Sequence, residues 1–253
     1  MRCNSHEQFV HLLIDMGDLL LASGAEINRV EDTISRMGKV YGAIEMSVFV
    51  ITSCMIVTMW LPNGVIITQT RRIGSTSSAD FSRLENLNAL SRRYCANLLS
   101  LSELDKEIHV LKNERLGRWK CFAGSTLVAG SFAMFFGGNL VDGIIAAVSA
   151  VLVCFVQEVL AKICVNRVIY QFLCALLIGI AINCVGVVVP SLYLDKIIIG
   201  NIMLLVPGIS MTNSVRDILV GDTISGVIRL VESVLWAGVL AAGFMVSIWM
   251  FGG

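Results

Sequence analysis

Charged residues are scarce in this chain of 253 residues. Asp, Glu, Lys and Arg make up 15% of it, whereas hydrophobic residues make up 56%. A soluble domain usually has about 25% charged and about 45–50% apolar residues. The formal net charge is zero, so no excess of positive charge points to nucleic acid as a partner. The composition instead predicts a protein embedded in membrane lipid.

Motifs of metal binding and covalent catalysis are also missing. The eight cysteines form no CxxC pair, and the last four (Cys154, Cys164, Cys174 and Cys184) lie ten residues apart. That spacing turns each cysteine away from the previous one on a helix. The chain contains no HExxH, no GxSxG and no glycine-rich phosphate loop. We therefore expect no metal, no cofactor and no catalytic residue, and we do not expect an enzyme.

The few charges are unevenly distributed along the chain. Residues 1–120 contain 14 of the 19 Lys and Arg and 13 of the 19 Asp and Glu. The first eleven residues are polar and lack the basic and apolar segments of a signal peptide. The sequence thus predicts a cytoplasmic α/β domain over residues 1–118, followed by a transmembrane domain over residues 119–253.

Periodic patterns predict the elements of the N-terminal domain. Apolar residues recur at helical spacing, β-branched and aromatic runs indicate strands, and Pro62-Asn63-Gly64 is typical of a hairpin turn. Asp80 or Ser78 is expected to cap one helix, and the Ser102-Glu103-Leu104-Asp105 pattern to open another. The predicted helices are 5–22, 25–41, 80–99 and 102–112, and the predicted strands are 47–52, 54–60 and 65–70.

The C-terminal domain contains apolar segments long enough for a bilayer, which needs about 20 helical residues. We expect an α-helical membrane protein with about five transmembrane helices: 120–137, 140–160, 169–189, 197–220 (broken at Pro207-Gly208) and 227–250. Lys162, Arg167, Arg216 and Arg229 then fall on the side of the N-terminal domain, as the positive-inside rule requires. This arrangement predicts a bacterial inner membrane protein with a periplasmic C-terminus. Four crossings with 197–225 as a re-entrant pair is the alternative.

The broken segment carries the predicted substrate site. The run 197–207 is only eleven residues long, so it reaches roughly half-way across the hydrocarbon core. A helix that starts after Gly208 would present free N–H groups there, and discontinuous helices often mark transport sites. We predict that an anionic or zwitterionic substrate contacts Pro207, Gly208, Thr212, Asn213, Ser214, Arg216 and Asp217. The alternative is that Arg216, paired with Asp217, anchors the helix at the membrane surface.

Four further polar residues lie in the apolar half and are candidates for polar contacts or a proton relay: Glu158, Asn183, Asn201 and Glu232. Charges inside a bilayer cost about 2.5–3.5 kcal/mol each. Simpler interpretations are an interfacial pair of Glu158 with Lys162, a pair of Glu232 with Arg229, and helix packing by Asn183 beside small residues.

Four segments resemble the bacterial threonine/serine exporter (ThrE) family: GAEINRVEDTISRMGKVYG at 24–42, RRI at 71–73, LENLNALSRR at 84–93 and LVPGISMTNSVRDILVGDTISGVIRLVES at 205–233. The resemblance covers nearly the whole chain and is closest to the larger, YjjP-type subunit of two-component succinate exporters. It implies a subunit of a secondary exporter for succinate or a related dicarboxylate, with threonine or serine as the alternative substrate. It also implies a small YjjB-like membrane subunit as partner, besides membrane lipid, and leaves a higher oligomer open.

Two other functions remain open for the N-terminal domain. Glu26, Asp32 and His11 are the residues that suggest a membrane-tethered enzyme. Alternatively, the domain regulates transport or senses a ligand.

Overall fold

The computed structural model describes residues 5–51, 53–73, 80–114, 117–164 and 166–252, which form two compact units. The first unit extends to residue 115 and also includes residues 209–230, and the second contains residues 116–208 and 231–253. The first division falls close to the predicted boundary after residue 118. The assignment of residues 209–230 to the first unit was not expected from the sequence.

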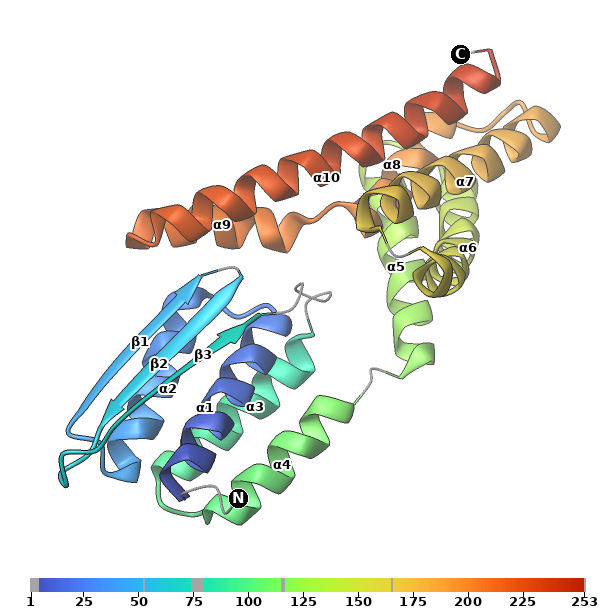
Figure 1. Cartoon of the computed structure of the whole chain (residues 1–253). Helices are drawn as coiled ribbons and strands as arrows, with labels where there is room; N and C mark the ends of the chain where they lie inside the picture. Colours follow the sequence, from blue (N-terminus) through green and yellow to red (C-terminus); the bar gives the residue numbers. More distant parts are fainter. Residues whose placement is uncertain (1–4, 52, 74–79, 115–116, 165, 253) are drawn as a thin grey trace. The chain divides into compact units, whose positions relative to one another are not determined.

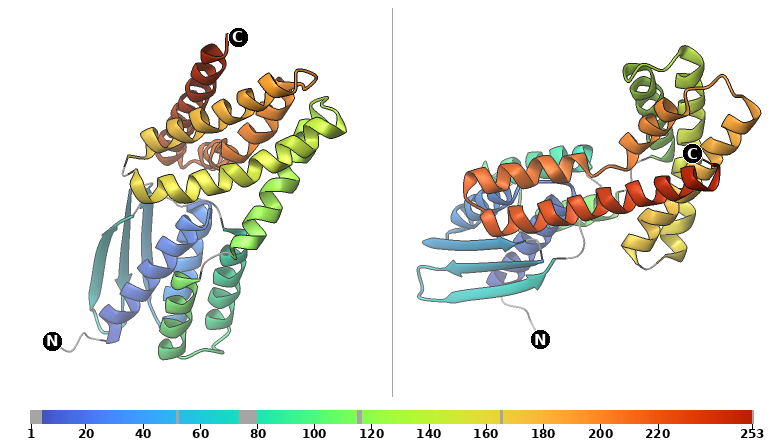
Figure 2. Two further views of the ribbon diagram at one scale, coloured as in Figure 1. Left: turned by 90° about the vertical axis from the view of Figure 1, so that its right-hand side faces the viewer. Right: turned by 90° about the horizontal axis from the view of Figure 1, so that it is seen from above.

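The first unit is a layered α/β fold (Figures 1 and 2). Helices α1 and α2 cover one face of a three-stranded sheet, and α3 and α4 pack on α1. Its elements in chain order are α1 (Ser5–Ala22), α2 (Ile27–Tyr41), β1 (Glu45–Ile51), β2 (Cys54–Trp60), β3 (Ile66–Arg72), α3 (Phe81–Cys95), α4 (Leu101–Asn113), α9 (Gly208–Val220) and the first residues of α10 (Thr223–Met250).

The sheet is an antiparallel meander with strand order β1-β2-β3. Val57 of β2 pairs with Val48 on one side and Gln69 on the other. The predicted hairpin turn is confirmed, because Gly64 has a φ of 75° and its N–H donates to Leu61 O over 3.0 Å. Glycine adopts this left-handed conformation without the strain that a Cβ would cause.

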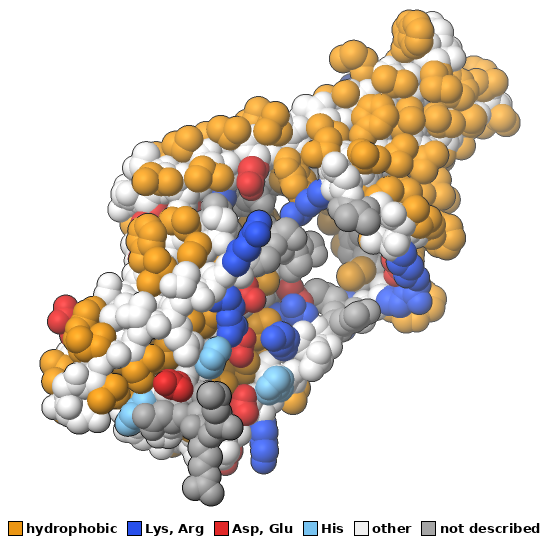
Figure 3. Space-filling model, viewed as in Figure 1, with side chains coloured by type: hydrophobic (Ala, Val, Ile, Leu, Met, Phe, Trp, Pro, Cys, Tyr) orange, Lys and Arg blue, Asp and Glu red, His pale blue; other side chains and the backbone are white. Residues whose placement is uncertain are grey.

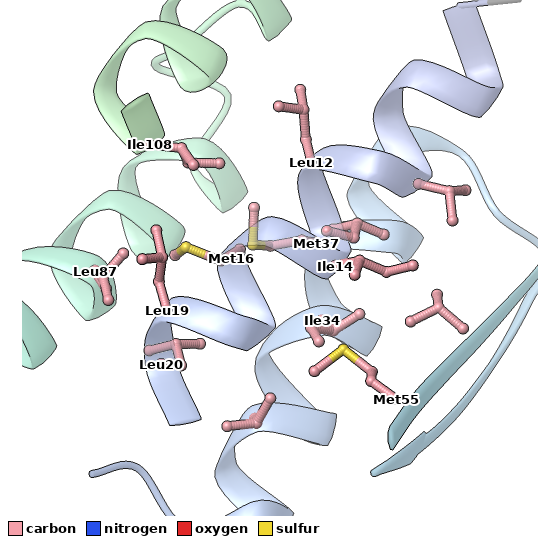
Figure 4. Packing of buried hydrophobic residues seen from close by; sticks show 14 of the residues in the cluster. Leu12, Ile14, Met16, Leu19, Leu20, Ile34, Met37, Met55, Leu87 and Ile108 are labelled. Carbon is pink, nitrogen blue, oxygen red and sulfur yellow. The ribbon is translucent and has the colours of Figure 1, made fainter. Parts of the chain in front are cut away.

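Large apolar side chains from α1, α2, β2, α3 and α4 form the core of the first unit. Figure 4 shows Met16 and Leu19 of α1 beside Leu87 and Ile108, and Met55 of the sheet beside Ile34. All of these side chains are buried. The helical spacing of the apolar residues in 5–22 thus produced a helix that is buried on several sides.

Three predicted helix ends in this unit are wrong, the first being that α2 begins at Ile27 and not at residue 25. Ser100, not Ser102, caps α4: its Oγ accepts from the Glu103 N–H over 3.4 Å, and Glu103 accepts from the Ser100 N–H over 2.8 Å. Helix α3 ends at Cys95 instead of Leu99, and Asn97 beyond it adopts a φ of 55°. Asp80 does cap α3, as expected, by accepting from the Arg83 N–H.

The second unit consists of α5 (Arg118–Phe135), α6 (Leu140–Ile163), α7 (Arg167–Val188), α8 (Leu194–Leu205) and the larger part of α10. Among the described residues, α6, α7 and α10 are long and apolar enough to span a membrane, and α8 with α9 adds a fourth if the broken pair counts as one span. The structure therefore supports three or four candidate spans. Helix α5, which covers most of the predicted span 120–137, does not meet these criteria, and it carries Arg118 and Lys120 in its first turn.

Small residues form the helix contacts of the second unit. A Cβ added to Gly200 would lie 2.5 Å from Ala129 O, and one added to Gly130 would lie 2.9 Å from Gly143 O. Large apolar side chains such as Leu127, Phe135 and Trp249 are exposed instead. Close backbone approach with apolar residues outside is the packing expected of helices in lipid.

Candidate functional site

The predicted helix break is present, and a buried side chain donates a hydrogen bond to a carbonyl group beside it. Helix α8 ends at Leu205 and α9 begins at Gly208. Pro207 has no N–H to donate, so carbonyl groups of the preceding turn lose helical partners. Gln171 of α7 donates its Nε2 to Leu205 O over 3.1 Å. The second unit thus supplies a hydrogen bond at its own end of the break.

The polar side chains beyond the break contact the turn between α1 and α2. Asn213 Nδ2 donates to Gly24 O over 3.1 Å, and Arg216 Nη1 lies 2.8 Å from Glu26 Oε1. These residues are almost two hundred positions apart in the chain. The cluster on α9 is therefore already engaged by protein groups of the first unit.

Asp217 is the most deeply buried charge of this cluster, with 2% of its side chain exposed. It accepts from Arg229 Nη1 over 3.1 Å and from the backbone N–H of Ile27. Ile27 is the first residue of α2, whose N-cap residue Glu26 makes no side-chain capping bond. Asp217 thus places a negative charge at the helix N-terminus, where the helix dipole favours it. The expected pairing of Asp217 with Arg216 is wrong.

The remaining residues of the predicted site have mixed environments. Ser214 is fully buried and donates to Met211 O over 2.7 Å. The Gly208 N–H donates to Val206 O over 2.8 Å, and Thr212 is exposed. Whether Pro207, Gly208 or Thr212 contacts a substrate stays a prediction, as does a position near the middle of the membrane.

Further acidic groups lie beside this cluster. Glu31 of α2 accepts from the Val50 N–H over 2.9 Å, at the edge of the sheet. Burial raises the pKa of Glu31 above its usual value, the Val50 N–H lowers it, and the charge of Asp222 raises it further. Glu31 thus connects α2 with the sheet through a hydrogen bond, and its charge is repelled by that of Asp222 in the turn between α9 and α10.

We call the residues Gly24, Glu26, Ile27, Asn213, Arg216, Asp217 and Arg229 the α2–α9 junction. It contains two ion pairs of opposite exposure. Arg216 in the first pair has 56% of its side chain exposed, whereas both partners of the Asp217–Arg229 pair are nearly buried. Chemically, the exposed pair can exchange its partners with a small charged molecule, and the buried pair holds the helices in place.

The structure does not bring together the four other predicted polar residues. Among the described residues, Glu158 pairs with Arg118 and not with Lys162, and Arg229 pairs with Asp217. Glu232 instead lies near Arg167, whose guanidinium covers the Trp236 ring at 3.7 Å. Asn183 donates to Gly179 O, and Asn201 donates to Ser149 Oγ and Ile197 O. Within the described part of the chain, no hydrogen bond or ion pair joins these four residues into a relay.

Sequence reasoning missed the roles of three residues. Gln171 is one of two amide side chains, with Asn183, in an apolar helix, and this was the available signal that it satisfies a buried group. The sequence suggested Glu26 only as part of an enzyme site, and it suggested Glu232 as the partner of Arg229. The partner of Gln171 lies 34 residues away, that of Glu26 lies on α9, and that of Arg229 lies 12 residues away on another helix, so local spacing gave no sign of them.

Comparisons with known proteins agree with the earlier resemblance. The model of a family described as putative threonine/serine exporter matches residues 11–251. A probable threonine/serine exporter of Mycobacterium tuberculosis is 20% identical over 239 residues. The match covers 94% of this chain but 45% of that protein, so the chain spans less than half the length of the relative. No solved structure gives a significant match.

Proposed function

Since the chain belongs to the family of putative threonine/serine exporters, we propose that it is one part of a membrane exporter for a small amino acid such as threonine or serine. Helices α6, α7 and α10 suit a protein that spans the membrane several times. In this proposal the membrane is the bacterial inner membrane, and the first unit faces the cytoplasm. No ATP-binding motif occurs in the sequence, and a proton or ion gradient is the expected energy source.

One observation supports this choice of substrate above all. In the α2–α9 junction a carboxylate, Glu26, and a guanidinium, Arg216, form an ion pair that is accessible to solvent. A zwitterion carries the same two charges, so its carboxylate can replace Glu26 on Arg216 while its ammonium group binds Glu26. The exchange changes no net charge and leaves the buried Asp217–Arg229 pair intact.

Succinate or a related dicarboxylate is the second candidate substrate. The presence of Arg216 and Arg229 in one cluster favours it, because two guanidinium groups can bind two carboxylates. Against it, Glu26 and Asp217 lie beside the same two arginines and would repel a dianion. The junction therefore fits an amino acid better.

We further propose that a second membrane polypeptide completes the transport path. The curated relative is more than twice as long as the part that this chain matches. A small membrane subunit of the YjjB type is the expected partner, and assembly into a higher oligomer is compatible with it.

An efflux experiment tests the proposal. Cells that express the chain with and without the small subunit are loaded with labelled threonine or succinate, and the rate of release is measured. Loss of a hydrogen bond to a charged group costs about 1.5–3 kcal/mol, so Arg216→Ala should reduce release about tenfold or more. Glu26→Gln should impair release of threonine more than release of succinate.

Arg36→Ala is the matched control, because Arg36 also forms an exposed ion pair on α2, with Asp32, away from the junction. Each variant must reach the membrane in the same amount as the parent. Unchanged release of both compounds by inserted Arg216→Ala protein contradicts the assigned site. Release of succinate alone makes the dicarboxylate the substrate.

A further inference from the structure

Helix α1 carries a polar stripe along one side, although most of the helix is buried. His11, Asp15 and Asp18 follow one another at spacings of four and three residues, which places them on one face. Ten other residues of α1 are buried, among them Leu12, Leu13 and Met16. The stripe does not belong to the α2–α9 junction.

Basic side chains from two other elements meet this stripe. Arg71 of β3 forms an ion pair with Asp15, and its Nη2 lies 3.3 Å from His11 Nδ1. Lys112 of α4 has its Nζ 4.0 Å from Asp15 Oδ1, which is too far for a hydrogen bond. Figure 3 shows basic, acidic and His side chains gathered on the face where Figure 1 shows α1 between β3 and α4.

The pairing in this cluster is incomplete. Among the described residues, the structure records no hydrogen bond or ion pair to the partly buried carboxylate of Asp18; the charges that act on it are those of Arg71, Asp15 and Lys112. Burial is the largest cause of its raised pKa. On β3, two residues before Arg71, the buried Oε1 of Gln69 also has no donor within the described part of the chain.

Such a cluster is expensive if it serves stability alone. A carboxylate that is partly buried beside a second carboxylate carries a desolvation cost, which the charges of Arg71 and Lys112 offset in part. Local violations of this kind are expected where a protein binds a ligand. A metal ion is not a suitable ligand, because no group of three His, Cys, Asp or Glu among the described residues fits one.

We propose that the face formed by His11, Asp15, Asp18, Arg71 and Lys112 binds a small zwitterionic α-amino acid. The ammonium group of the ligand supplies the donor that Asp18 lacks. Its carboxylate accepts from Lys112 Nζ and from Arg71 Nη2. The site lies outside the α2–α9 junction, so it provides the first unit with a ligand of its own and does not depend on the proposed route of transport.

The charges of the cluster select the ligand class. A dicarboxylate would bring a second negative charge to Asp15 and Asp18, and a simple amine would leave Lys112 without a new acceptor. An α-amino acid places both charges within a few ångströms of one another, as the alternating carboxylates and basic groups require. The side chain of the amino acid is of secondary importance in this arrangement, so several small amino acids should bind.

Calorimetric titration of the purified full-length chain in detergent tests this site. L-threonine and L-alanine are the probes, and succinate is the control ligand. Both amino acids should bind and succinate should not. Asp18→Asn and Lys112→Met should each weaken binding of the amino acids about tenfold or more, since each removes a hydrogen bond to a charged group.

Arg36→Ala serves as the control variant, because Arg36 forms an exposed ion pair with Asp32 that belongs neither to this face nor to the junction. Retained binding in Arg36→Ala, together with weakened binding in the other two variants, supports the proposal. Lys112→Arg keeps the charge and should keep most of the affinity, which separates loss of a contact from loss of the fold.

Three results would overturn the site. These are no binding of either amino acid by the parent chain, parent-like binding by Asp18→Asn and Lys112→Met, or an equal loss in all variants including Lys112→Arg. The titration is also independent of the efflux assay. Binding that survives in Arg216→Ala while efflux is lost shows two separate sites, whereas intact binding with no efflux in any arrangement contradicts only the transport proposal.

Discussion

The two units of the molecule satisfy their buried polar groups in different ways. The first unit surrounds a core of large side chains such as Phe9, Leu13 and Met16, and it places its charges in ion pairs. The second unit has a core in which alanines contribute heavily, and its buried amides donate to hydroxyl and carbonyl groups. Many of its large apolar side chains, such as Leu127 and Trp249, are exposed.

This difference follows from the solvent that each unit suits. Water drives large apolar side chains into the interior of the first unit. Lipid provides no such force, so helices associate through close backbone contact and internal hydrogen bonds. The unexpected member is α9, which continues an apolar segment in sequence but uses the charge pairs typical of the first unit.

The largest effect is expected from a substitution that breaks the buried ion pair of the first unit. Asp217→Asn removes the negative charge beside Arg229, and loss of one partner from a buried ion pair costs about 3–5 kcal/mol. Thermal unfolding of the purified chain in detergent measures the loss. Glu26→Gln is the control, because its partner Arg216 is largely exposed and such pairs contribute about 0–1 kcal/mol. Equal shifts in both variants would contradict the distinction between the two pairs.

The next effect concerns the close helix contacts of the second unit. Gly200→Ala places a Cβ 2.5 Å from Ala129 O, and overpacking of this kind costs about 1–3 kcal/mol. Gly124→Ala is the matched control, because a Cβ at that glycine of α5 meets no atom within 4 Å in the described part of the chain. The control should be neutral or more stable, since alanine favours a helix over glycine by about 1 kcal/mol. If both variants unfold at the same temperature, close backbone approach is not what holds this unit together.

A smaller effect is expected from a substitution at the start of α4 in the first unit. Ser100→Ala removes the side-chain cap of α4, which should cost about 1 kcal/mol. Ser102→Ala is expected to change the unfolding temperature very little, because Ser102 lies inside the helix. If Ser102→Ala lowered the unfolding temperature more than Ser100→Ala, Ser102 would be the cap, as first predicted from the sequence.

The smallest effect is a dependence of stability on pH. The pKa of Glu31 is raised in the folded chain by burial, so the folded state binds the proton more tightly than the unfolded state. The contribution of Glu31 to stability therefore falls as pH rises from its unfolded pKa through its folded pKa. Glu31→Gln should make the unfolding temperature less sensitive to pH above the usual glutamate pKa of about 4.3. An identical pH profile for parent and variant would assign the sensitivity to another group.

Local patterns were sufficient for most of the elements. Apolar spacing predicted α1 with its observed ends, and the Pro62-Asn63-Gly64 turn gave the β2–β3 hairpin. The capping error at Ser102 is of the same local kind, since two serines within three positions compete for one helix start. The helix break was also predictable, because Pro207 and Gly208 interrupt an apolar run.

Partners distant in the chain were not predictable from the same patterns. Glu158 was assigned to Lys162, four residues away, whereas its partner Arg118 lies forty residues away. Asn213 and Arg216 showed a polar cluster, but nothing in their spacing pointed to Gly24 or Glu26. The sequence therefore indicates which residues need a partner, and only the fold determines which partner each one has.

The contact between Asp217 and Ile27 has a consequence for biosynthesis. A ribosome that adds about 5–20 residues per second incorporates Ile27 about 10–40 s before it incorporates Asp217. During that interval α5, α6, α7 and α8 are synthesised, while the start of α2 still lacks its carboxylate. The N-terminal unit is thus the first to emerge and among the last to be completed, and a chain that stalls before α9 leaves it unfinished.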